Sequence, residues 1–316
     1  MEFQELLSIP GRIRENVMKV IVGKQDAIDL VMTALFAGGH VLLEDVPGTG
    51  KTVLAKSLAA SVSLAFKRIQ FTPDLMPSDV TGMNVYNQKE EAFRFQPGPV
   101  FANVVLADEI NRATPRSQAS LLECMEEKQV TVDGVTRPLA APFFVIATQN
   151  PIETQGTFPL PEAQLDRFLL KLKMGYPDQQ DSLTILDRFI LDQPLAHIAP
   201  VASGEDILAV QEAVRRVEVS APVREYMVGL VEKTRTLDEV LLGASPRGLL
   251  ALLRACQAYA LVMGRAYVLP DDVQRLVKPV LGHRVLTKNA FGRSNQAETV
   301  LDEVIRQVRV PTETVT

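Results

Sequence analysis

The sequence predicts an α/β protein in which a parallel sheet is covered by helices on both faces and is followed by a smaller, all-helical domain. Three observations predict this architecture. Apolar runs of strand length alternate with segments of helical periodicity, a glycine-rich loop joins one such run to a helix, and the periodicity beyond residue 178 is helical throughout.

The first part of the chain contains five segments of strand length. Most are continuously apolar, which is typical of strands buried on both faces, and helix-like segments separate them, beginning with 3–22 and 25–36. The predicted strands are 41–43, 66–70, 104–107, 143–147 and 168–172.

The second part shows only helical patterns, many of which begin with Ser, Asp or Pro, residues that are common at helix starts. We therefore divide the chain into an α/β domain, 1–177, and a helical domain, 178–316. The helical segments predicted within the second domain are 183–191, 205–214, 222–233, 246–263 and 270–280.

Composition narrows the functional classes. The formal net charge of -5 and the pI of about 5.4 argue against a protein that binds duplex DNA by bulk positive charge. The two cysteines, Cys124 and Cys256, have no metal-ligand spacing and are expected to be buried and reduced. No stretch reads as a signal peptide or a membrane span, so we expect a cytoplasmic protein without membrane insertion.

The segment 44–52, EDVPGTGKT, follows a predicted strand and opens a predicted helix, which is the context of a phosphate-binding loop. Gly48 and Gly50 allow backbone N–H groups to face phosphate oxygens, and the helix start adds a positive dipole end. Lys51 can reach the outer phosphates, and the hydroxyl of Thr52 can bind Mg²⁺. An unliganded glycine-rich turn is the weaker alternative.

Asp45 stands where the strict pattern has glycine. Aspartate tolerates unusual backbone angles, but its charge would oppose phosphate binding. We therefore expect its carboxylate to point away from the phosphates.

Two carboxylates, Asp108 and Glu109, end the apolar strand 104–107. Asp108 can hold Mg²⁺ beside Thr52, and Glu109 can orient and deprotonate the attacking water. Downstream of a phosphate-binding loop this interpretation is preferred to a pair of solvated acids.

Three further residues complete the predicted constellation. Asn150 follows the strand 143–147 and is placed to touch the γ-phosphate or the water. Arg167 precedes a strand, and its alternative role is a local ion pair with Asp166 or Glu162. Arg247 lies in a first helical turn, which is unfavourable for a cation, so we expect an anionic partner for it.

Together these residues resemble an AAA+ P-loop ATPase, and specifically the MoxR family. The resemblance extends to about residue 285 and is carried by five segments: HVLLEDVPGTGKT at 40–52, FTPDLMPSDVTG at 71–82, LADEINRATPRSQASLLECMEEKQVTVDG at 106–134, ATQNPIETQGTFPLPEAQLDRF at 147–168 and ASPRGLLALLRACQAYALVMGR at 244–265.

The resemblance implies ATP and Mg²⁺ as ligands and a role for each residue. It makes Lys51 and Thr52 the Walker A pair, with Pro47, Gly48, Thr49 and Gly50 as the loop; Asp108 and Glu109 the Walker B metal residue and catalytic base; Asn150 sensor 1; Arg167 an arginine finger acting on the neighbouring subunit; Arg247 sensor 2; and Val22 and Gly23 the turn beside adenine. A finger used in trans implies a homo-oligomeric ring, expected to be a hexamer.

Two insertions are expected to be hairpins, near 83–95 and 129–140, the second with the turn signal Asp133-Gly134. In the family such hairpins face the ring pore or partners, although each could be a plain surface hairpin.

The resemblance implies an ATPase that drives chaperone-like remodelling, maturation, or cofactor or metal insertion of a client protein, together with a von Willebrand factor A-domain partner. The alternatives are a nucleic-acid motor or loader, a metal-chelatase motor subunit, and a nucleotide switch, which would need neither Glu109 nor Arg167. The balanced charge of the hairpins makes nucleic acid the less favoured partner.

Overall fold

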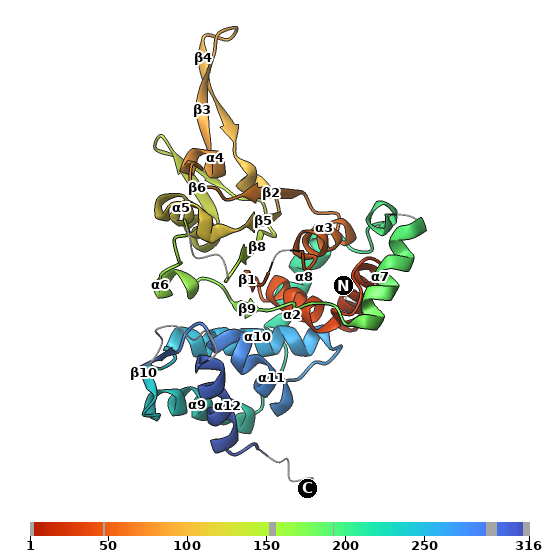
Figure 1. The fold of residues 1–316 in the computed structure, drawn as a ribbon, viewed down its shortest axis with the longest axis vertical. Helices are drawn as coiled ribbons and strands as arrows, with labels where there is room; N and C mark the ends of the chain where they lie inside the picture. Colours follow the sequence, from red (N-terminus) through yellow and green to blue (C-terminus); the bar gives the residue numbers. More distant parts are fainter. Residues whose placement is uncertain (1–2, 47, 152–155, 192, 289–295, 312–316) are drawn as a thin grey trace.

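A five-stranded parallel sheet forms the centre of the computed structural model, which describes residues 3–46, 48–151, 156–191, 193–288 and 296–311 (Figure 1). The strand order is β2-β5-β8-β1-β9, and every pairing is parallel. The predicted α/β fold is confirmed, with the strands at β1 (Val41–Glu44), β2 (Phe66–Gln70), β5 (Val104–Asp108), β8 (Phe144–Gln149) and β9 (Leu170–Leu172).

The central strands are continuously apolar because each face of the sheet has its own core. Along β5, Val104 and Leu106 belong to one buried cluster, whereas Val105 and Ala107 belong to the other. The first cluster includes residues of α1 (Phe3–Met18), α2 (Gln25–Phe36) and α3 (Lys51–Ser61), and the second includes residues of α4 (Pro77–Thr81) and α5 (Pro115–Glu127). Helices on both faces thus fix the carboxyl ends of the strands at one edge, where ligands bind in such sheets.

Two antiparallel hairpins leave this core. The longer one consists of β3 (Gly82–Asn87) and β4 (Ala92–Pro97) and projects far from the body of the molecule (Figure 1). The shorter one consists of β6 (Gln129–Val132) and β7 (Val135–Pro138), and its turn has positive φ at Asp133 and Gly134. Short helices connect these parts: η1 (Pro99–Phe101), η2 (Ile110–Arg112) and α6 (Glu162–Leu165).

Four helices pack together as the C-terminal bundle: α9 (Ala221–Thr236), α10 (Pro246–Val262), α11 (Pro270–Leu281) and α12 (Gln296–Gln307). The predicted helices ended at residue 280, so α12 is an addition. The bundle also carries a short antiparallel ladder, β10 (Val240–Leu242) with β11 (Leu286–Thr287). Helical periodicity did not indicate this ladder because its strands span only three and two residues.

Three helical elements that follow residue 178 lie beside the N-terminal helices. Helix α8 (Gly204–Val214) packs against α1 and α2, and η3 (Pro194–His197) contacts α3. Helix α7 (Gln179–Leu191) runs next to the start of the chain (Figure 1), and its Arg188 donates to the carbonyl oxygens of Met18 and Lys19. The chain therefore returns to the core before it enters the bundle.

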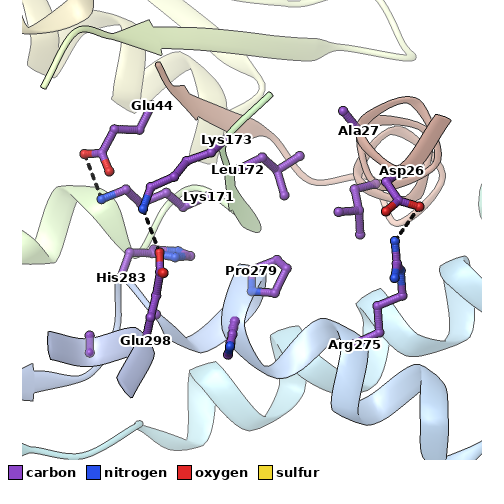
Figure 2. A pocket seen from close by; sticks show the side chains of 14 residues that line it. Asp26, Ala27, Glu44, Lys171, Leu172, Lys173, Arg275, Pro279, His283 and Glu298 are labelled. Carbon is purple, nitrogen blue, oxygen red and sulfur yellow. Dashed lines mark hydrogen bonds and ion pairs between the residues drawn. The ribbon is translucent and has the colours of Figure 1, made fainter. Parts of the chain in front are cut away.

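A pocket of about 380 Å³ marks the junction between the core and the bundle (Figure 2). Two ion pairs span it: Lys173 lies 2.8 Å from Glu298, and Arg275 lies 2.6 Å from Asp26. A third, between Lys171 and Glu44 at 2.9 Å, lies within the core at the end of β1. The bundle thus meets the sheet directly beside the strand that leads into the phosphate-binding loop.

Candidate active site

The phosphate-binding loop runs from the end of β1 to the start of α3. Gly50 caps the helix with φ +88°, and Gly48 has φ +84°. A Cβ atom would meet nothing within 4 Å at either position, so the left-handed backbone, rather than crowding, requires glycine there. Thr49 is buried in the same turn, and Pro47 lies outside the described residues.

The carboxylate of Asp45 points away from the loop interior, as predicted. Its Oδ2 accepts hydrogen bonds from the backbone N–H groups of Met174 (2.9 Å) and Gly175 (2.7 Å), and its Oδ1 accepts from that of Val46 (2.9 Å). The side chain is buried. Asp45 therefore ties the start of the loop to the segment that follows β9.

Lys51 bends back over the loop. Its Nζ donates to the carbonyl oxygens of Asp45 (2.8 Å) and Val46 (3.2 Å). Burial lowers the pKa of Lys51, and the nearby carboxylates of Asp45, Asp108 and Glu109 oppose that shift. Phosphate oxygens could replace these two carbonyl acceptors of Lys51.

Asp108 ends β5 and is held on both sides. Its Oδ1 accepts from the hydroxyl of Thr148 (2.6 Å), and its Oδ2 accepts from the guanidinium of Arg68 (2.6 and 3.0 Å). The same Thr148 hydroxyl accepts from the backbone N–H of Glu109 at 2.8 Å. One threonine on β8 thus positions both members of the acid pair.

Glu109 occupies the left-handed region, with φ 55° and ψ 50°, which is uncommon for a residue with a Cβ atom. Its Oε2 accepts from the side-chain amide of Gln70 (2.7 Å) and lies 3.1 Å from Arg112. The side chain is 24% exposed, so it remains reachable by water. Such strained residues cluster at functional sites.

These groups line one cleft of about 420 Å³. Asn150, predicted as a γ-phosphate contact, is also part of its wall. The cleft is lined by Gly48, Gly50, Lys51, Thr52, Val53, Arg68, Gln70, Asp108, Glu109 and Asn150.

A second pocket, of about 200 Å³, adjoins the first and shares Gly48, Gly50 and Val53 with it. Its wall is mainly apolar and includes Val22, which is expected to lie beside adenine; Gly23 follows with φ +67°. A Cβ atom on Gly23 would lie 1.8 Å from the carboxylate of Asp181. The remaining wall consists of Val20, Ile21, Lys24, Thr49, Pro177, Ile185 and Phe189. An apolar slot beside a phosphate cradle fits a nucleobase.

The oxygen donors in the cleft suit Mg²⁺. Thr52 and Asp108 face the same space, and a hydroxyl plus a carboxylate is the ligand chemistry that this ion prefers in nucleotide sites. Arg68 pairs with Asp108 and would share it with, or yield it to, the metal.

Arg167 and Arg247 lie together at a different place. Among the described residues that line the cleft and the base pocket, neither appears. Arg167 pairs with Glu126 at 2.6 Å rather than with the neighbouring acids expected as its alternative partners. Arg247 has the anionic partners predicted for it, Glu126 (3.3 Å) and Asp166 (3.2 Å).

Sequence reasoning missed two residues of the cleft wall, Arg68 and Gln70, and the buried Thr148 behind it. Arg68 and Gln70 lie on β2, and the parallel register places Gln70 beside Asp108. Thr148 lies one strand further, on β8. A search of the carboxyl ends of all predicted parallel strands would have found them.

Comparisons with known proteins identify relatives of this chain. The model of the ATPase family associated with various cellular activities (AAA) matches residues 40–170, and that of the AAA lid domain matches residues 232–304. The chain is 51% identical to the uncharacterized protein YeaC of Bacillus subtilis, over 98% of each chain. It is 42% identical to the chaperone MoxR1 of Mycobacterium tuberculosis, over 94% of this chain and 81% of that protein.

The fold has a close match among solved structures. The crystal structure of a candidate ATPase from Cytophaga hutchinsonii superimposes with a TM-score of 0.90 at 37% identity and covers 98% of this chain and 97% of that one. Within the described part of the chain, every helix is too short or too polar to cross a membrane.

Proposed function

Because this chain belongs to the MoxR family of AAA+ ATPases and hydrolyses ATP, we propose that it works as a homo-oligomeric ring that remodels or matures a client protein. In this proposal ATP is hydrolysed in the cleft. Two arginines on another surface contact the nucleotide of the neighbouring subunit, and the hairpins contact the client. The ring is a hexamer, and its place of action is the cytoplasm.

Within one subunit, Lys51 and the loop N–H groups bind the phosphates, while Val22 and Gly23 bound the base. Thr52 and Asp108 would hold Mg²⁺, which would offset the charge on the phosphates. Glu109 takes the proton of the attacking water, and Asn150 orients that water. The pairing of Glu109 with Gln70 at 2.7 Å supports this role because it fixes the carboxylate at the rim of the cleft.

Arg167 and Arg247 act in trans in this proposal. The supporting observation is their joint position away from the cleft of their own chain, with 30% and 55% of their side chains exposed. A guanidinium that stabilises transferring phosphate contributes about 10³–10⁵ in rate. We expect Arg167→Ala to bind ATP normally and to hydrolyse it far more slowly.

Mixed rings test this assignment. Lys51→Ala cannot use its own cleft but keeps Arg167, whereas Arg167→Ala keeps an intact cleft. Each variant alone should be nearly inactive, and a mixture should regain activity because intact clefts then meet intact arginines. Mixtures no faster than the separate variants, or a fast Arg167→Ala, would contradict action in trans.

The two hairpins carry the observation that favours a protein client. Tyr86 and Phe93 are 51% and 73% exposed on the projecting hairpin, with ring centroids 5.4 Å apart. Arg94 on the same hairpin is compensated by Glu90 at 3.2 Å. An exposed aromatic pair with balanced charge suits an apolar protein segment better than a phosphate backbone.

The hairpins are also joined to each other. The side-chain amide of Asn84 donates to Asp133 at 2.6 Å, and the guanidinium of Arg137 lies 3.9 Å from the centre of the Phe95 ring. A movement of one hairpin would therefore shift the other.

A photoreactive phenylalanine analogue in place of Phe93 identifies what the hairpin touches. Glu109→Gln with ATP should trap the engaged state, and Lys51→Ala provides the control without nucleotide. We expect ATP-dependent adducts that protease removes, which mass spectrometry can assign to a client or to a von Willebrand factor A-domain partner. Adducts removed by nuclease would favour the motor or loader instead, and a metal-chelatase subunit among them would favour that role.

A further inference from the structure

Glu126 lies between the two arginines proposed to act in trans. It belongs to the last turn of α5, and its two oxygens are divided: Oε2 is 2.6 Å from Arg167, and Oε1 is 3.3 Å from Arg247. Arg167 also donates to the carbonyl oxygen of Leu122 on the same helix, at 2.8 Å. One carboxylate thus joins an arginine of the core to an arginine of the C-terminal bundle.

The cluster of charged side chains around Arg167 and Arg247 has a net positive charge. Asp166 accepts from Arg284 at 2.7 Å through Oδ1 and lies 3.2 Å from Arg247 through Oδ2. Arg284 is only 4% exposed and also donates to the carbonyl oxygens of Phe168 and Leu169, so it is a structural cation. Three guanidiniums and two carboxylates leave one positive charge, which lies on the exposed arginines.

We propose that Glu126 is a positioning residue that holds Arg167 and Arg247 as one bidentate unit for the triphosphate of a second copy of this chain. This inference rests on the trans role proposed above. Two neighbouring guanidiniums repel each other, and a shared carboxylate offsets that repulsion and fixes their spacing. Without Glu126 the two cations would separate, and Arg247 of the bundle would no longer be held beside Arg167 of the core.

The helix that carries Glu126 also starts next to the subunit's own acid pair. Helix α5 begins at Pro115, after the short η2 turn that follows Glu109, and spans about 20 Å at the usual helical rise. Gln118 on this helix donates to the carbonyl oxygen of Ile110 at 3.1 Å. The state of one cleft can therefore reach the arginines that serve the next cleft through a single rigid element.

Glu126→Gln tests the proposal because it removes the charge and keeps the shape. We expect kcat to fall by about 10- to 100-fold, since a misplacement of about 1 Å has effects of that size. The Kd for ATP of the subunit's own cleft should change by less than about twofold. Glu126→Asp should recover part of the rate. Glu123→Gln, on the exposed side of the same helix, is the matched control and should behave as wild type.

A double-mutant cycle separates positioning from a merely structural role. In the background of Arg247→Ala, Glu126→Gln should lower kcat by less than about threefold because there is no longer a pair to hold. Independent, multiplicative losses in the cycle, or a wild-type kcat for Glu126→Gln, would overturn the inference. If Arg167→Ala itself hydrolyses ATP at the wild-type rate, the trans role is wrong; if it is slow while Glu126→Gln is fast, only the inference is wrong.

Discussion

Asp45 offers the sharpest test of how the phosphate-binding loop is held. Replacing Asp45 with Ala removes the acceptor for three backbone N–H groups, those of Val46, Met174 and Gly175. A buried N–H group without a partner costs about 1–3 kcal/mol. Met174 is buried, whereas Val46 and Gly175 are partly accessible to water and can bond to it instead, so the expected loss in the free energy of unfolding is about 2–4 kcal/mol.

The size of the effect should follow the chemistry of the substitution. Asp45→Asn keeps one acceptor oxygen and should lose about half as much, roughly 1–2 kcal/mol. Asp45→Gly restores the strict loop pattern, yet it should be at least as unstable as Asp45→Ala because the anchor is missing. Weaker ATP binding should accompany the loss of stability, because the anchored segment leads to Pro177 in the wall of the base pocket.

Thermal unfolding measures this directly. At about 2 °C per kcal/mol for a chain of this size, Asp45→Ala should lower Tm by about 4–8 °C. Asp187→Asn, an exposed acid on α7, is the control and should shift Tm very little. The reasoning fails if Asp45→Ala unfolds within about 0.5 kcal/mol of wild type, the usual range for surface substitutions.

Three further predictions concern the cleft and the core. Lys51→Ala should abolish ATP binding measured by calorimetry, whereas Lys56→Ala, exposed on the same helix, should retain it. Gln70→Ala should lower kcat by roughly tenfold at an unchanged Kd for ATP, because Glu109 loses the donor that orients it; a changed Kd with normal kcat would contradict this. Burial lowers the pKa of His40 to about 4. The contribution of the neutral His40 to the free energy of unfolding is therefore fully present above pH 6.5 and decreases as the pH falls towards 4. Between pH 7 and pH 5 the wild type should lose about 2 kcal/mol more than His40→Asn in urea unfolding, and an equal loss in both proteins would contradict this.

Features of the site that lie within one continuous segment could be predicted from the sequence. Contacts between residues that are distant in the sequence could not. The loop at 44–52 and the acid pair were found because each is a contiguous pattern with one chemical meaning. Arg68 and Gln70 were missed because only the pairing of β2 with β5 brings them to Asp108 and Glu109. The partner of Arg167 was missed for the same reason, since Glu126 is distant in sequence and the nearer acids looked sufficient.

The fold shows the same division. The apolar strands were predicted because burial on two faces leaves an unmistakable pattern, which the two core clusters explain. The ladder of β10 and β11 and the helix α12 depend on packing between distant segments. In α12 the buried residues Val300, Leu301 and Val304 recur at helical spacing, and this amphipathic pattern is the signal in the sequence that could have found the helix.

The net charges of the cleft and of the arginine cluster around Glu126 affect how strongly neighbouring subunits would attract each other in the proposed ring. The charged residues lining the cleft are two cations, Lys51 and Arg68, and two anions, Asp108 and Glu109, so the described wall is neutral. Mg²⁺-bound ATP has a net negative charge, and its binding makes this surface negative. The arginine cluster around Glu126 retains one positive charge, so in the proposed ring the attraction between this cluster and the neighbouring cleft would strengthen after nucleotide has bound. Such an ordering would keep the arginines away from an empty cleft and would couple ring contact to the presence of a substrate.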